Sequence, residues 1–83
     1  MRYTKELLFE LNVLNQFSLE SSQHGIKVHK NADEDLIEAT RRLFDKGLIT
    51  QVDGGYLTPL GRDAREASAS VLLILTTENR QPI

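Results

Sequence analysis

The sequence contains no cysteine, which excludes disulfide bonds and thiolate metal sites. A chain of 83 residues therefore depends on side-chain packing, or on association with another chain, for its stability. No stretch approaches the roughly 18 consecutive apolar residues that span a bilayer. The chain begins with Met1 and Arg2 and continues into an amphipathic segment, not into the apolar run of a signal peptide. We expect a cytoplasmic protein with no membrane, metal or cofactor partner.

A strong net charge is also missing. Ten Lys and Arg residues stand against twelve Asp and Glu residues, and the formal net charge is −2 with both His neutral. A strong nucleic-acid binder has a more basic balance than this. The sequence has no internal repeat, low-complexity tract or Pro/Gly/Ser linker. We expect one domain over residues 1–76 and a flexible C-terminal tail over residues 77–83.

The most informative stretch spans residues 43–62, with the sequence LFDKGLITQVDGGYLTPLGR. Gly47 is of the type that ends helices in the left-handed conformation. The Asp-Gly-Gly sequence at 53–55 is typical of a tight hairpin turn. Thr58 can accept the free N–H groups at the start of a helix, and Pro59 suits the first helical position. This stretch predicts a helix, a β-hairpin and a second helix.

Hydrophobic periodicity and capping residues place the other elements. Thr4 is the expected N-cap of the first helix, and Asn31 with Glu34 forms an expected capping box for the third. The expected helices cover residues 4–15, 18–24, 31–46 and 59 onward, and the expected strands cover residues 26–30, 48–52 and 56–58. The sequence thus predicts a mainly α fold with a small β-sheet, in the order α-α-β-α-β-β-α.

The first and last helices are apolar on more than one side. In the first helix four leucines share one face, and Phe9 and Val13 lie nearly opposite. The end of the last helix is apolar nearly all round, and such helices are usually covered on all sides. We therefore expect a homodimer formed through these two helices. The expected interface residues are Phe9, Val13, Ala67, Val71, Leu72, Ile74 and Leu75.

The central stretch resembles the second half of a winged helix-turn-helix domain, as in MarR-like and PadR-like bacterial regulators. The residues that carry the resemblance are Leu43, 46–49, 53–57, Thr58, Pro59, Gly61 and Arg62. The resemblance implies that the helix before the hairpin enters the DNA major groove, that the wing touches the backbone, and that flanking helices dimerise. The whole chain also resembles a small bacterial protein family of about this length, which implies no particular activity.

A DNA-binding role depends on bases that can neutralise phosphates. The helix over residues 31–46 has more acids than bases, and residues 51–55 at the hairpin tip contain no Lys or Arg. The best basic cluster lies in and around the strand over residues 26–30, and a symmetric dimer would double it. Arg62 and Arg65 are possible additions. The expected nucleic-acid contacts are Lys27, His29, Lys30, Arg41 and Arg42.

Each of these residues also has a simpler interpretation. The polar positions of residues 26–30 can be the solvated side of a strand. Arg41 is explained by an i,i+4 ion pair with Asp45, and Arg42 is explained in the same way by Glu38. In this interpretation the bases are solvated side chains and helix ion pairs, with no role in DNA binding.

Enzymatic interpretations have less support. The sequence has no Cys nucleophile and no Gly-rich phosphate loop. His24 and His29 are not spaced as part of a tetrahedral metal site, and Ser21 and Ser22 near His24 do not form a triad. We expect a non-enzymatic protein. Two functions stay open: a small bacterial DNA-binding or transcription-associated protein, and a protein-interaction module on a winged-helix scaffold that does not bind DNA.

Overall fold

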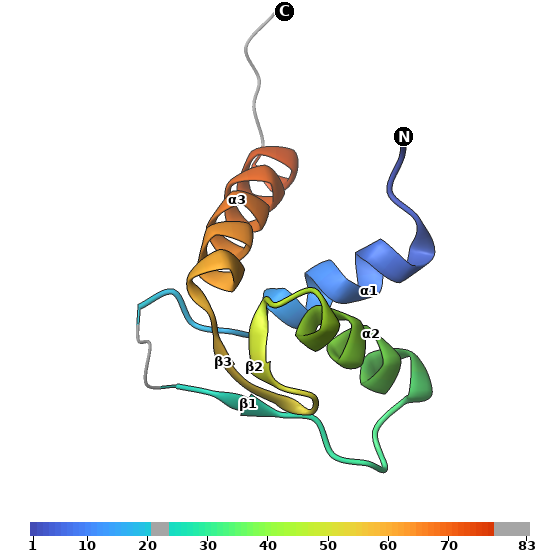
Figure 1. Cartoon of the computed structure of the whole chain (residues 1–83). Helices are drawn as coiled ribbons and strands as arrows, with labels where there is room; N and C mark the ends of the chain where they lie inside the picture. Colours follow the sequence, from blue (N-terminus) through green and yellow to red (C-terminus); the bar gives the residue numbers. More distant parts are fainter. Residues whose placement is uncertain (21–23, 78–83) are drawn as a thin grey trace, which may run out of the picture.

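The computed structural model describes residues 1–20 and 24–77, and the predicted tail beyond Thr77 lies outside the described residues. The described elements follow in the order α-β-α-β-β-α (Figure 1). They are α1 (Lys5–Leu14), β1 (Ile26–Lys27), α2 (Glu34–Asp45), β2 (Ile49–Gln51), β3 (Gly54–Leu57) and α3 (Pro59–Thr76). The predicted mainly α fold with a small sheet is confirmed. None of the described helices is long and apolar enough to cross a bilayer.

The helix predicted over residues 18–24 is wrong where the structure describes it. Ser18 and His24 have no regular secondary structure, Leu19 and Glu20 form a bend, and residues 21–23 lie outside the described part of the chain. The hydroxyl of Ser18 accepts the backbone N–H of Glu20 at 3.1 Å. Serine side chains often bond to a backbone group two residues away in this manner, and such a bond competes with helix formation.

Three helix ends are fixed by the residues that the sequence indicates. Thr4 accepts the backbone N–H of Leu7 on its Oγ1 at 3.2 Å and caps α1. Thr58 accepts the N–H of Gly61 at 3.0 Å and caps α3, and its hydroxyl also donates to the carbonyl of Gly47 at 2.6 Å. Gly47 has a φ of 80°, as expected after the end of α2. Thr58 therefore connects the end of α2 to the start of α3.

The start of α2 differs from the prediction. Its N-cap residue is Asp33, which makes no side-chain capping bond, and the Asp33 carbonyl accepts the N–H of Ile37 at 3.0 Å. The capping box predicted between Asn31 and Glu34 is therefore wrong, because Asn31 lies two residues before the cap. Glu34 and Asp35 still occupy the first turn, where negative charge favours the helix.

The sheet has the strand order β1-β3-β2, with both pairings antiparallel. Ile26 lies opposite Gly55, and Lys27 lies opposite Gly54. Gly54 and Gly55 have φ values of 134° and 76°, which side chains resist. A Cβ on Gly54 would also overlap the carbonyl oxygen of Ile26. The turn predicted at residues 53–55 lies instead at Val52 and Asp53, and Gly54 and Gly55 begin β3, where they let β1 pair beside the hairpin. The predicted strand is confirmed for residues 26–27.

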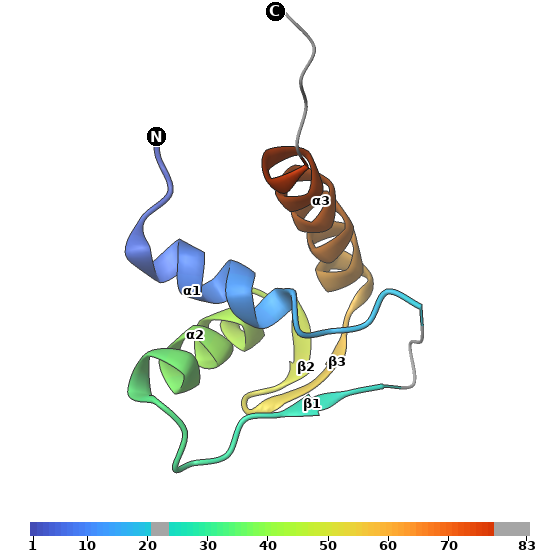
Figure 2. The same cartoon turned by 180° about the vertical axis from the view of Figure 1, so that it is seen from behind.

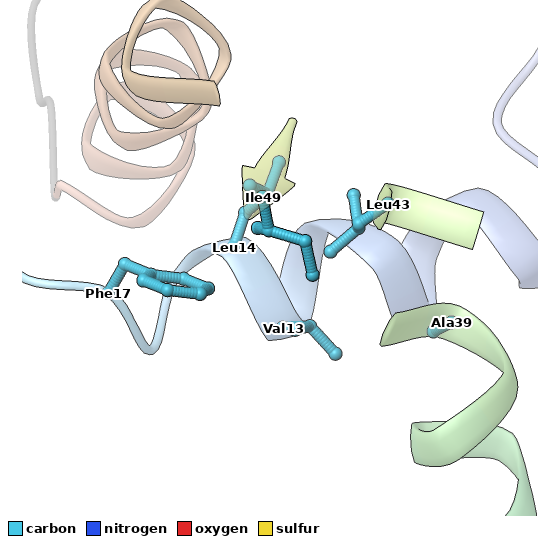
Figure 3. Packing of buried hydrophobic residues seen from close by; sticks show 6 residues of the cluster. All are labelled: Val13, Leu14, Phe17, Ala39, Leu43 and Ile49. Carbon is cyan, nitrogen blue, oxygen red and sulfur yellow. The ribbon is translucent and has the colours of Figure 1, made fainter. Parts of the chain in front are cut away.

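The hydrophobic core lies between α1, α2 and β2 (Figure 3). The buried apolar residues are Val13, Leu14, Phe17, Ala39, Leu43 and Ile49. Thr40 is also fully buried, and its hydroxyl donates to the carbonyl of Leu36 at 2.7 Å. Its polar group is therefore satisfied inside the helix, so the core carries no cost for an unpaired hydroxyl.

In the structure Phe9 and Val13, which are expected on a side of α1 that a second copy would cover, pack within the chain's own core. Val13 is 0% exposed, Phe9 packs against the core, and Leu8 is instead 49% exposed. From the core α1 and α3 extend in diverging directions, so that the start of α1 and the end of α3 stand apart (Figures 1 and 2). The exposed Leu8 lies together with residues of α3 around one hollow, so it is on the side of α1 that faces α3.

Candidate nucleic-acid interface

A concavity of about 710 Å³ lies between α2, the segment that begins in β1, and the β2–β3 turn. Its lining residues are Lys27, Val28, His29, Lys30, Asn31, Ile37, Thr40, Arg41, Val52 and Asp53. Three separate stretches of the chain, within residues 27–31, 37–41 and 52–53, therefore build its walls. We call this site the basic concavity.

Four of the five predicted nucleic-acid contacts line the basic concavity. Lys27, His29 and Lys30 come from β1 and the segment after it, and Arg41 comes from α2. All four residues are exposed. Asp53 is the acid in the lining. A chain with a net charge of −2 thus gathers three cations and an imidazole against one carboxylate at this place.

Backbone hydrogen bonds hold the basic segment in position. The N–H of Val28 donates to the carbonyl of Asp53 at 2.8 Å, which joins the segment after β1 to the hairpin turn. The N–H of Ala32 donates to the carbonyl of His29 at 2.9 Å and closes a turn. The side chains around the turn are thus presented from a backbone with defined partners.

The acids of α2 lie outside the lining of the concavity. The lining residues of α2 are Ile37, Thr40 and Arg41, which share one side of the helix at spacings of three and four. The acids of α2 that are absent from the lining are Glu34, Asp35, Glu38 and Asp45. Glu38 and Asp45 nevertheless lie three and four residues from Arg41 on the surface of α2, so these acids border the concavity at Arg41.

Arg42 is separated from the other four predicted contacts. Its Nε donates to Oε2 of Glu10 at 2.9 Å, and its Nη2 donates to the carbonyl of Glu6 at 3.2 Å. The ammonium of Lys46 also pairs with Glu10, which is only 5% exposed. Two cations of α2 thus compensate one buried carboxylate of α1. The predicted i,i+4 pair of Arg42 with Glu38 is not formed.

The second predicted ion pair of α2 is also absent. Among the described residues, Arg41 makes no ion pair, although Asp45 lies one turn later in the helix. Its guanidinium group is therefore available at the rim of the basic concavity. The adjacent arginines of α2 thus have different surroundings: Arg42 lies between α1 and α2, and Arg41 lies at an open surface.

Arg62 and Arg65 hold the chain after α1 against α3. Arg65 donates from Nε to the carbonyl of Phe17 at 2.9 Å and from Nη1 to Oδ1 of Asn15 at 3.0 Å. Arg62 donates from Nη1 to the carbonyl of Leu19 at 3.4 Å. Neither arginine lines the basic concavity. These contacts satisfy carbonyl groups of a segment without regular secondary structure.

The predicted dimer residues fall into two groups. Phe9 and Val13 belong to the packing of the chain's own core. The α3 residues are exposed, and the exposed fractions of the four large ones lie between 46% and 76%. These α3 residues are Ala67, Val71, Leu72, Ile74 and Leu75.

The sequence reasoning missed several residues of these sites. The sequence places Val52 and Asp53 at the hairpin tip and assigns no site role to Ile37, but all three line the basic concavity. The sequence assigns no role in packing to Glu10. Its position three and four residues before Val13 and Leu14, on the buried side of α1, is the signal that could have placed it.

The fold and the site define a small protein of helices and one antiparallel sheet with a basic concavity beside its second helix. Residues 1–76 match the model of a family of unknown function, DUF5669, and the chain belongs to this family. No curated protein and no solved structure shows a significant match.

Proposed function

We propose that this protein is a small, non-enzymatic, winged-helix-like DNA-binding protein that is associated with transcription and acts as a homodimer. The observation that carries the proposal is the gathering of Lys27, His29, Lys30 and Arg41 around one concavity beside α2. A helix followed by a hairpin and a further helix, with β1 added beside β3, supports the winged-helix assignment.

In this proposal the basic concavity receives a stretch of the DNA backbone. Lys27 and Lys30 act as mobile point charges, while the guanidinium of Arg41 can donate two parallel hydrogen bonds to one phosphate. A DNA-binding protein typically makes roughly 6 to 10 phosphate contacts, which exceeds what one concavity offers. Two copies related by a twofold axis double the number of bases, so the homodimer is part of the proposal.

A protein-interaction module is the second candidate function. The hairpin turn favours it, because Val52 is 51% exposed and Asp53 lies beside it, where a DNA-contacting wing would present bases. An apolar side chain next to a carboxylate suits the surface of a protein better than a phosphate backbone. In this alternative the bases of the concavity bind acidic side chains of a partner.

Salt-dependent binding to duplex DNA of random sequence separates the two candidates. We expect fluorescence anisotropy to show binding at about 50 mM salt that weakens by orders of magnitude toward about 200 mM, because counterions compete for the phosphates. The Lys27→Gln/Lys30→Gln variant should bind more weakly. Lys5→Gln is the matched control, since Lys5 is exposed at the start of α1 and outside the concavity. Absence of binding at the lower salt concentration would favour the interaction module.

A further inference from the structure

A second concave surface lies between α1 and α3. It has a volume of about 450 Å³, and its walls are formed chiefly by Leu8 and Leu11 of α1 and by Val71, Leu72 and Leu75 of α3. We call it the apolar groove. None of its lining residues is charged. A surface without cations cannot neutralise phosphates, so we do not expect the apolar groove to bind DNA as the basic concavity is proposed to do.

The end of α3 also has an apolar side that faces away from the groove. Leu73 and Ile74 are 65% and 71% exposed and are not among the groove residues. Residues 67–77 contain no charged side chain. Since successive residues of a helix point about 100° apart, Val71 to Leu75 make the end of α3 apolar all round. One chain thus carries an apolar groove and, on the same helix, an apolar ridge formed by Leu73 and Ile74.

We infer that a second copy of this chain fills the apolar groove, with the Leu73–Ile74 ridge of each copy lying in the groove of the other. A twofold axis makes both contacts at once. If the ridge of the first copy lies in the groove of the second, symmetry places the ridge of the second copy in the groove of the first. The inference rests on the homodimer of the proposed function and assigns its interface. It does not depend on whether the basic concavity binds DNA.

Charge and surface area favour a second copy over another occupant. Groove and ridge are both uncharged, so their contact buries no unpaired ion. A peptide in the groove would leave Leu73 and Ile74 in water, whereas reciprocal contact covers both surfaces. The side chains to be covered are Tyr3, Leu8, Val71, Leu72, Leu73, Ile74 and Leu75, each 46% to 76% exposed. Together they expose on the order of 800 Å² per copy, which is the area that each partner buries in a stable interface of standard size.

Sedimentation velocity of the full chain tests the association itself. We expect a dimer at micromolar concentrations and a dissociation constant raised by roughly tenfold or more in Leu73→Glu/Ile74→Glu, because two carboxylates would enter an apolar groove. Leu60→Glu is the matched control, since Leu60 is 56% exposed on α3 but lies outside the groove. Unchanged far-UV circular dichroism confirms that the variants keep their fold.

Chemical cross-linking tests the arrangement, and the absence of native cysteine makes it specific. A mixture of Leu8→Cys and Ile74→Cys chains should give a cross-linked dimer with a short bis-maleimide reagent. A mixture of Glu38→Cys and Ile74→Cys chains should not, because Glu38 lies on α2 and outside the groove. A dimer that cross-links only between two Ile74→Cys chains would overturn the groove-and-ridge arrangement while the homodimer stands.

Other occupants give different results in the same experiments. A wild-type chain that stays monomeric at tens of micromolar would overturn both the homodimer and its interface. Binding of that monomer to vesicles of a neutral phosphatidylcholine, lost in Leu73→Glu/Ile74→Glu, would assign the apolar surface to lipid instead. DNA binding is measured separately by anisotropy, so its failure would remove the DNA role without removing the dimer.

Discussion

Arg42 of α2 holds the buried carboxylate of Glu10 in α1, with 2.9 Å between Nε and Oε2. Lys46, the C-cap residue of α2, pairs with the same carboxylate. The side chains of Arg42 and Lys46 are 31% and 47% exposed, whereas that of Glu10 is 6% exposed. The cations are therefore partly hydrated, and the acid depends on them for its charge compensation.

This asymmetry predicts unequal costs for removing the partners. The Arg42→Gln/Lys46→Gln variant leaves a buried carboxylate without a cation and should lose about 3 to 5 kcal/mol of unfolding free energy. Glu10→Gln leaves cations that water can solvate and should lose only about 1 kcal/mol. Urea unfolding followed by circular dichroism measures both. Equal losses would show that Glu10 is not the group that needs the pair.

The basic concavity predicts which bases set the salt dependence of DNA binding. Each phosphate contact that is lost should lower the slope of log affinity against log salt by about one. Lys27→Gln, Lys30→Gln and Arg41→Gln each remove one contact from each copy, so in the proposed homodimer each should lower the slope by about two in an anisotropy titration.

Arg42→Gln provides the internal comparison for this series, because Arg42 is engaged with Glu10 and lies outside the basic concavity. Its slope should match that of the wild type. If Arg42→Gln lowers the slope as much as Arg41→Gln does, Arg42 also contacts DNA. That result would contradict the proposed role of the concavity.

The junction of hairpin and α3 predicts a strict requirement at position 61. A Cβ on Gly61 would overlap the carbonyl oxygen of Leu48, which is backbone and cannot rotate away. Gly61→Ala should therefore lose about 1 to 3 kcal/mol of stability, despite the better helix propensity of alanine. Ser70→Ala, at an exposed position of the same helix, should be neutral in the same thermal unfolding experiment.

The double role of the Thr58 hydroxyl predicts a graded series at that position. Thr58→Ser keeps a group that can accept from Gly61 and donate to Gly47, so it should stay within about 0.5 kcal/mol of the wild type. Thr58→Val keeps the shape and loses both bonds, which should cost about 1 to 2 kcal/mol. Equal stability of the two variants, measured by urea unfolding, would show that packing alone fixes the junction.

The parts of the fold that the sequence predicts are those with local causes. Gly47, Thr58 and Pro59 act within a few residues of themselves, so the hairpin and the ends of its neighbouring helices could be predicted. The rotation of α1 about its axis could not be predicted from the sequence. It depends on Glu10 meeting Arg42 and Lys46, which lie 32 and 36 residues further along the chain.

The site was predictable to a similar extent. Alternating polar positions after Ile26 predict Lys27 and His29 on the solvated side of a strand, and Lys30 follows them directly in the sequence. Whether Arg41 or Arg42 joins them depends on how α2 is rotated about its axis. Packing of Ala39, Thr40 and Leu43 into the core decides this rotation, and no local signal in the sequence separates two adjacent arginines.

The brevity of β1 has a consequence for the solubility of the protein. β1 is an edge of the sheet, and an open edge can recruit strands from other molecules into aggregates. Here the edge is two residues long, includes Lys27, and is followed closely by His29 and Lys30. An approaching copy would have to bring its own cluster of like charge against this one. The side chains that we propose to bind a phosphate backbone therefore also oppose pairing of β1 with β1 of another copy.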